Sequence, residues 1–172
     1  MDTMGTTESL RVAAGAVIQL VDGIDEATWE RPGLGTWSVR DLVGHTSRAL
    51  VTIVEYLANT PEPPPAVNVP DAETYYQHVF TGYTDHAAVA RRGIDAGQAL
   101  GDDAVEALRT LLDSALGAIA TASAETSDPE QAPSATVTVG TLTIPLDEYL
   151  RTRVFELVVH GYDITRATGQ VL

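Results

Sequence analysis

Cysteine is absent from this chain of 172 residues. Its absence excludes disulfide bonds, cysteine nucleophiles and thiolate metal ligands, so any thiol chemistry requires a thiol that arrives with a small molecule. Basic residues are also scarce, because 10 Lys and Arg stand against 24 Asp and Glu and give a formal net charge of -14. We therefore expect no nucleic-acid partner and no binding to an anionic membrane surface, since both attract basic patches.

Long apolar runs and a targeting segment are missing as well. No stretch approaches the length of a membrane span, and the first residues, MDTMGTTESLRV, lack the basic and apolar regions of a secretory signal. A hydrophobic content of 44% and a mean hydropathy of +0.01 are typical of a globular protein. We expect one cytoplasmic domain over residues 1–172, with a flexible tail over residues 1–7.

Five segments of the chain carry apolar residues at helical spacing. The best-marked start is Ser38, which is expected to be an N-cap, with Asp41 at the third helical position completing a capping box. The proline-rich segment 61–70 cannot continue a helix and predicts a stiff connection. The helices expected from these patterns cover residues 9–24, 39–57, 71–93 and 102–122, and a last helix begins near residue 146.

A short β element is expected before the last helix. The segment ATVTVGTLTIP alternates β-branched residues around Gly140, which is typical of a hairpin, and Pro145 ends it. The polar segment 125–134 before it is typical of a loop. The sequence therefore predicts an all-α fold: a four-helix bundle with a long crossover connection and a small β-hairpin before the last helix.

Glu156 and His160 are the pair that points most directly to chemistry. They lie four residues apart in the last predicted helix, so at about 100° per residue they share one face. Such a pair either stabilises its helix or binds one divalent metal ion, for which His45 is a third candidate ligand. Asp163, three residues after His160, is either a surface acid or the acceptor of the second ring N–H of a ligating histidine.

Neighbouring residues each have two interpretations. Tyr149 and Arg153 share a border of the last helix with Glu156 and His160, and this polar column is either a solvated flank or a pocket wall. Arg153 either forms a surface salt bridge or binds a cofactor. His78 lies beside an aromatic stripe and is either structural or a pocket residue that contacts a cofactor.

Two segments carry a resemblance to a known family. TWSVRDLVGHTSRAL and RTRVFELVVHGYDITRATG resemble the metal-binding motifs of the DinB-like bundle superfamily, and more narrowly its mycothiol-dependent maleylpyruvate isomerase and mycothiol S-transferase branch. The resemblance implies a DinB-like four-helix bundle in which His45, Glu156 and His160 bind zinc or another divalent metal. It also implies mycothiol as the thiol cosubstrate, at the open coordination position.

The expected function is a metal-dependent, mycothiol-dependent S-transferase, in which a metal-bound thiolate attacks an electrophilic small molecule. The isomerases of this branch carry a second domain, whereas this sequence ends at Leu172, so we expect transfer rather than isomerisation. An isomerase would also require a basic patch for two substrate carboxylates, and none is evident in so acidic a chain. A non-catalytic metal-binding interaction module and a metal-dependent hydrolase are the further alternatives, and the protein is expected to be a monomer or a homodimer.

Overall fold

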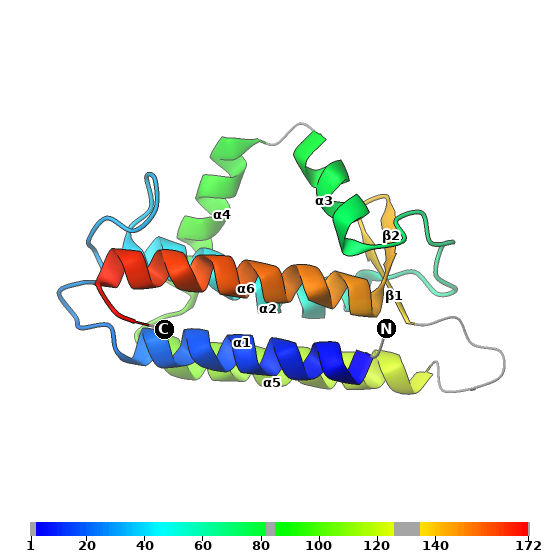
Figure 1. The fold of residues 1–172 in the computed structure, drawn as a ribbon, viewed down its shortest axis with the longest axis horizontal. Coiled ribbons are helices and arrows are strands. Elements are labelled where there is room, and N and C mark those ends of the chain that lie inside the picture. The colour runs from blue at the N-terminus through cyan, green and yellow to red at the C-terminus, as the bar shows by residue number, and fades with distance from the viewer. Residues whose placement is uncertain (1–2, 82–84, 126–134, 172) are drawn as a thin grey trace.

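The computed structural model describes residues 3–81, 85–125 and 135–171, and within these ranges the chain is predominantly helical (Figure 1). This confirms the predicted all-α fold with a small hairpin before the last helix. In chain order the elements are α1 (Thr3–Asp22), α2 (Val39–Asn59), α3 (Ala72–Thr81), α4 (His86–Ala99), α5 (Ala104–Glu125), β1 (Thr136–Val139), β2 (Leu142–Pro145) and α6 (Leu146–Thr168).

The four longest helices, α1, α2, α5 and α6, form the bundle. Helices α1 and α2 each pack against both α5 and α6, while α3 and α4 rise from one side of the bundle and make the long crossover from α2 to α5 (Figure 1). The core is an apolar cluster with at least one fully buried side chain from each bundle helix, as helical periodicity requires. Its members include Leu10, Leu42, Ile53, Leu108, Leu150 and Leu157.

The start of α2 is as the sequence predicted. The Ser38 hydroxyl accepts a hydrogen bond from the Asp41 backbone N–H at 3.2 Å, and the Asp41 carboxylate accepts one from the Ser38 N–H at 3.0 Å. This reciprocal arrangement satisfies two backbone donors at the helix end. It also fixes where the first turn of α2 begins, and therefore where His45, two turns later, lies.

The single helix expected over residues 71–93 is wrong, because the structure contains α3 and α4 there. Helix α4 has its own start, since the Asp85 carboxylate accepts hydrogen bonds from the backbone N–H groups of Ala87 and Ala88, both at 3.0 Å. Gly93, expected near the helix end, lies inside α4. A Cβ atom at this position would lie 2.8 Å from the Trp37 ring, so the glycine makes room for the indole.

The start of α1 also differs from expectation, because it lies at Thr3 rather than near residue 9. Residues 3–7 of the predicted tail are the beginning of α1, where Thr7 donates a hydrogen bond to the Thr3 carbonyl at 2.8 Å and Thr6 is buried. Residues 1–2, and residues 126–134 of the predicted loop, lie outside the described part of the chain.

The hairpin leads directly into α6. Strands β1 and β2 pair antiparallel with Val139 opposite Leu142, and Gly140 takes a positive φ of 64° in the turn, as a glycine can without strain. Asn68 ties the segment before α3 to the hairpin, because its carboxamide oxygen accepts a hydrogen bond from the Thr143 N–H at 2.8 Å. Among the described helices, none combines the length and apolarity needed to cross a membrane.

Candidate metal centre

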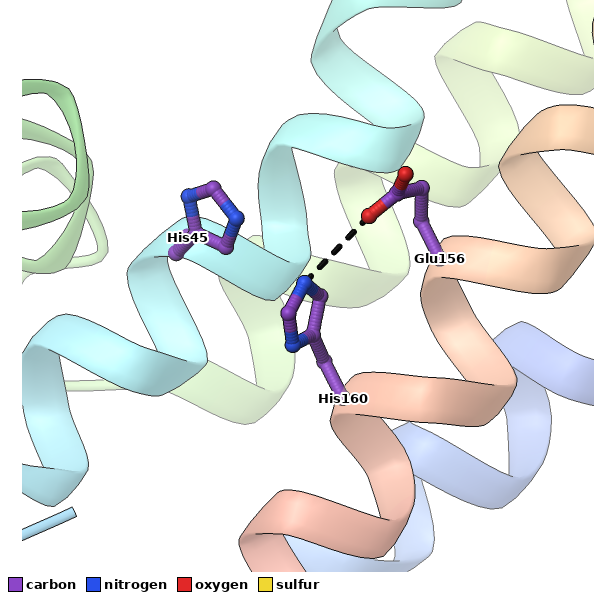
Figure 2. Close-up of side chains that lie close together, drawn as sticks. All are labelled: His45, Glu156 and His160. Atoms are coloured by element: carbon purple, nitrogen blue, oxygen red, sulfur yellow. Dashed lines mark ion pairs between the residues drawn. The ribbon is translucent and has the colours of Figure 1, made fainter. Parts of the chain in front are cut away.

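Helices α2 and α6 lie side by side and bring three candidate ligands together (Figure 2). His45 extends from α2, and Glu156 and His160 extend from consecutive turns of α6. One donor atom from each of the three side chains can be chosen so that all lie within 4.8 Å of one another. The predicted proximity of His45 to the Glu156 and His160 pair is therefore confirmed.

The pair on α6 has the spacing of two ligands of one ion. The Nε2 atom of His160 lies 3.3 Å from Oε2 of Glu156. Two donors that are each about 2.0–2.1 Å from a tetrahedral zinc ion lie roughly 3.4 Å apart. The separation of these two side-chain atoms thus matches that of two tetrahedral ligands.

His45 is a half-buried base with one buried ring nitrogen that lacks a partner among the described residues. Its Nδ1 atom is buried and has no hydrogen-bond partner among the described residues. Its ring lies between two others, with centroids 4.5 Å from Trp37 and 4.8 Å from His160. Burial, reinforced by the charge of His160, lowers the pKa of His45 to about 4. The imidazole is therefore neutral at pH 7, which is the form that binds metal ions.

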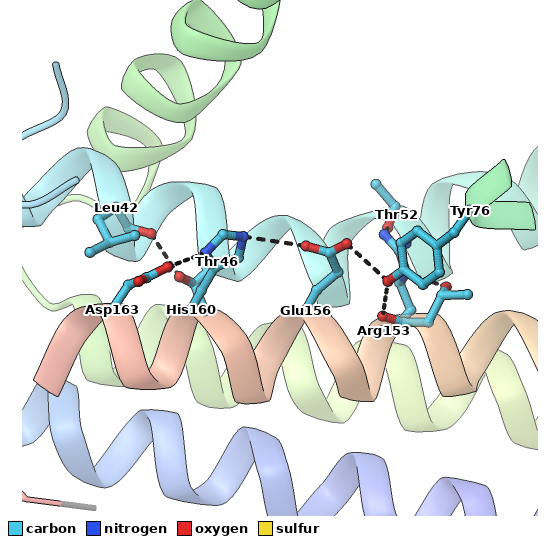
Figure 3. Close-up of polar contacts among 9 residues, drawn as sticks. Leu42, Thr46, Thr52, Tyr76, Arg153, Glu156, His160 and Asp163 are labelled. Atoms are coloured by element: carbon cyan, nitrogen blue, oxygen red, sulfur yellow. Dashed lines mark hydrogen bonds and ion pairs between the residues drawn. The ribbon is translucent and has the colours of Figure 1, made fainter. Parts of the chain in front are cut away.

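His160 is held by a carboxylate on each side. Its Nδ1–H donates to Oδ2 of Asp163 at 3.1 Å, and its Nε2 faces Glu156 (Figure 3). Burial lowers the pKa of His160, but the hydrogen bonds to Glu156 and Asp163 outweigh burial and raise it above its usual value. Asp163 thus accepts the ring N–H on the far side of His160 and directs the Nε2 atom toward Glu156.

Glu156 uses its two carboxylate oxygens for different partners. Oε2 faces His160, whereas Oε1 accepts a hydrogen bond from the Tyr76 hydroxyl at 3.0 Å (Figure 3). Burial would raise the pKa of Glu156, but the hydrogen bonds from His160 and Tyr76 and the charge of Arg153 lower it. The carboxylate is therefore ionised at neutral pH and can act as an anionic ligand.

A pocket of about 560 Å³ opens beside these side chains. His45 and Glu156 lie in its wall, together with the three guanidinium groups of Arg48, Arg92 and Arg153. Within the described residues, none of these arginines pairs with a carboxylate at 4.0 Å or less. The pocket is thus locally basic in a chain whose net charge is -14.

This basic pocket was missed by sequence reasoning, which found no evident basic patch. Its three arginines come from α2, α4 and α6, so no local run of positive charge exists to reveal them. The prediction that Arg153 faces a pocket agrees with its position. Its Nε–H donates to the Thr152 hydroxyl at 3.0 Å, and its guanidinium lies 4.8 Å from the centre of the Tyr149 ring.

His78 does not join the cluster of candidate ligands. His78 is exposed on α3 and is not among the residues that line this pocket, which disfavours the cofactor contact expected for it. The side chain of His86 lies outside the described part of the structure. Trp37 packs between α4 and His45, because its indole N–H donates to the Ala90 carbonyl at 3.0 Å and its ring lies against the His45 ring.

Comparison with known protein families found a match. The family described as "Mycothiol maleylpyruvate isomerase N-terminal domain" matches residues 10–165, a span that contains all three candidate ligands. The chain therefore belongs to this family, which is part of the DinB-like superfamily and is a mycothiol-related enzyme family. No curated protein and no solved structure matched the chain.

Proposed function

We propose that this protein is a metal-dependent S-transferase that uses mycothiol and modifies an electrophilic small molecule. The observation that carries the proposal is the cluster of His45, Glu156 and His160, whose donor atoms lie within 4.8 Å of one another. The buried Nδ1 atom of His45 supports it, since a buried polar atom without a partner costs about 1–3 kcal/mol. Membership of a mycothiol-related family supports the choice of thiol.

Two imidazoles and one carboxylate suit zinc or a similar divalent ion, and leave a position open for an exogenous ligand. When bound, such an ion lowers the pKa of a coordinated thiol and so favours the thiolate at neutral pH. In the transfer, the thiol loses its proton, sulfur forms a bond to carbon, and the leaving group departs with the bonding electrons. Because the chain has no cysteine, no thiol of its own competes for the site.

The surrounding residues have defined roles in this proposal. Asp163 holds His160 in the orientation that directs Nε2 toward Glu156. Arg48 and Arg92 are donors for an anionic group of the substrate, and Phe80 contributes an apolar wall. The proposed partners are therefore a small-molecule thiol and an electrophile, rather than a nucleic acid or a membrane, and the protein is proposed to act as a monomer or a homodimer.

Turnover of a bromobimane-type electrophile tests the mechanism. We expect the rate above the uncatalysed background to require added mycothiol, to fall after chelation and to return when zinc is restored. Full turnover after chelation would contradict the metal-dependent mechanism. Full turnover without mycothiol would indicate hydrolysis or a different thiol.

One observation favours a second candidate, an isomerase of an unsaturated diacid that is assisted by mycothiol. The three arginines of the pocket, Arg48, Arg92 and Arg153, are suited to bind two carboxylates. The two reactions differ in thiol consumption, because transfer uses one thiol per turnover whereas isomerisation returns it. Measuring free thiol during turnover of maleylpyruvate therefore separates them. If neither reaction occurs with the metal-loaded protein, a metal-binding interaction module is favoured instead.

A further inference from the structure

The two carboxylate oxygens of Glu156 have different partners, a tyrosine hydroxyl from α3 and the candidate ligand His160. Its Oε1 atom accepts the hydrogen bond from Tyr76 at 3.0 Å, while Oε2 lies 3.3 Å from Nε2 of His160 and faces the cluster (Figure 3). A carboxylate can bind a metal ion through one oxygen or through both. Here the two oxygens have different surroundings, and only Oε2 lies beside a second candidate ligand.

The Tyr76 hydroxyl is a donor under neutral conditions. A tyrosine hydroxyl can donate a hydrogen bond, whereas an ionised carboxylate can only accept one, so Tyr76 is the donor in its contact with Glu156. The hydroxyl has two acceptors within reach, Oε1 of Glu156 at 3.0 Å and the Thr152 carbonyl at 3.1 Å. Because the Thr152 carbonyl belongs to the turn of α6 that precedes Glu156, the phenol is anchored to the helix that carries the ligand.

Helix α3 delivers Tyr76 to this position through contacts at its first turn. The Glu148 carboxylate accepts a hydrogen bond from the Ala72 N–H at 3.0 Å, and Arg151 forms an ion pair with Glu73 at 3.1 Å. These contacts tie the beginning of α3 to α6, one turn before Tyr76. The hydroxyl of Tyr76 is thus placed by the docking of α3 on α6.

Aromatic packing restricts the Tyr76 ring. It stacks on Phe80, with centroids 5.6 Å apart and planes at 15°, and meets Phe155 edge to face at 5.5 Å. Contacts on two sides limit rotation of the ring and therefore the reach of its hydroxyl. The hydrogen bond to Glu156 is consequently made by a preorganised donor.

We propose that Tyr76 is a positioning residue that limits Glu156 to coordination through one oxygen. This rests on the proposed function, in which Glu156 is a ligand of a divalent ion. With one oxygen of Glu156 and one nitrogen from each histidine, the protein supplies three donors and the open position completes a four-coordinate site. Without the Tyr76 hydroxyl, Oε1 is released and both carboxylate oxygens can bind, which favours ions that take more oxygen ligands.

The test replaces zinc with Co²⁺, whose visible absorption is strong in four-coordinate sites and weak at higher coordination numbers. We expect the wild-type protein to show strong absorption and Tyr76→Phe to show a weaker band with Co²⁺ bound. We also expect Tyr76→Phe to bind zinc about 10- to 100-fold less tightly, as is typical when a partner of a ligand is removed. Far-UV circular dichroism establishes that the variant keeps its helices.

Tyr75→Phe is the matched control. It removes a hydroxyl from the adjacent tyrosine, which is buried and whose ring lies edge to face with that of Tyr76. Its Co²⁺ spectrum and zinc affinity should equal those of the wild type. Identical spectra and affinities in wild type and Tyr76→Phe would overturn the role of Tyr76 while leaving the metal site intact. Failure of the wild type to bind Co²⁺ would overturn the metal site itself, and this inference with it.

Discussion

The rings of His45 and His160 meet edge to face, with centroids 4.8 Å apart and planes at 80°. One ring comes from α2 and the other from α6, and their surroundings differ in charge. No carboxylate contacts the His45 ring among the described residues, whereas His160 contacts both Glu156 and Asp163. Two identical side chains in contact therefore have pKa values shifted in opposite directions.

The first prediction concerns the protonation of these two rings in the metal-free protein. We expect His160 to titrate above its ordinary pKa of 6.5, and His45 to stay neutral until the pH approaches about 4. Nitrogen chemical shifts of the two imidazoles, followed by NMR from pH 4 to pH 8, measure this directly. Titration of both rings at the same pH would show that their surroundings do not differ as the structure indicates.

The lowered pKa of His45 has a consequence for the stability of the folded protein. Because the pKa of His45 is lower in the folded state than in the unfolded state, the folded state binds fewer protons between pH 6.5 and about 4. This contribution therefore lowers the free energy of unfolding as the pH falls through that window. The variant His45→Gln has no titrating group at this position. The wild type should therefore lose stability relative to His45→Gln as the pH falls from 6.5 to about 4, and urea unfolding at several pH values measures the difference.

The second prediction concerns metal content. The purified wild-type protein should hold about one divalent ion per chain, and His160→Ala should lose most of it, because two remaining protein ligands compete poorly with water. His78→Ala is the control, since His78 is exposed on α3 and outside the cluster. Elemental analysis of the three proteins decides the matter, and equal metal in all of them would place the ion elsewhere.

The third prediction concerns Asp163, which accepts the hydrogen bond from His160 at 3.1 Å. Asp163→Ala should weaken zinc binding by about 10- to 100-fold, because the ligating imidazole loses both its orientation and its anionic partner. The control Asp113→Ala removes an exposed acid on α5. Competition with a chromogenic chelator measures the affinities, and similar values for both variants would argue against a role for Asp163.

The fourth prediction concerns the basic pocket. Arg92→Gln should raise the KM for a carboxylated electrophile about two- to fivefold, as expected for a charge pair that solvent screens, and should leave the KM for a neutral electrophile unchanged. Arg91→Gln removes the neighbouring exposed arginine, which does not line the pocket. If the two variants behave alike with both electrophiles, the pocket does not select for negative charge.

The fifth prediction compares two helical glycines. Gly93→Ala should destabilise the protein by about 1–3 kcal/mol, because the new Cβ would lie 2.8 Å from the Trp37 ring. Gly15→Ala should instead stabilise it by up to about 1 kcal/mol, since no atom lies within 4 Å of its added Cβ and alanine favours helix. Thermal unfolding of both variants checks the opposite signs. Equal shifts would show that Gly93 does not accommodate the indole.

Local patterns predicted what depends on neighbours in the sequence. The capping box of Ser38 and Asp41, the turn at Gly140 and the shared face of Glu156 and His160 each involve residues within a few positions of one another. Such features follow from helix and turn geometry alone. The sequence also nominates His45 as a third ligand, but nothing local to α2 indicates that this residue faces α6, and its place beside Glu156 and His160 follows from the structure.

Contacts between distant segments could not be predicted in this way. The hydrogen bond from Tyr76 to Glu156 depends on the angle at which α3 docks on α6. The second of the two helices that replace the expected third helix begins directly after Asp85, whose carboxylate caps α4. In the sequence alone, nothing distinguishes Asp85 from an exposed acid within a helix. The low helix propensity of glycine predicts a helix end at Gly93, whereas the structure places this glycine inside α4, where it packs against Trp37.

The crossover between α2 and α5 lines the pocket but carries none of the candidate metal ligands, so the two can vary separately. Its two helices supply Tyr76, Phe80 and Arg92 to the site, but none of the three candidate metal ligands. Each helix has its own attachment: α3 through Glu148 and Arg151 on α6, and α4 through the close approach of Gly97 to Gly44 on α2. Substitutions in the crossover can therefore reshape the pocket without changing any of the three candidate ligands.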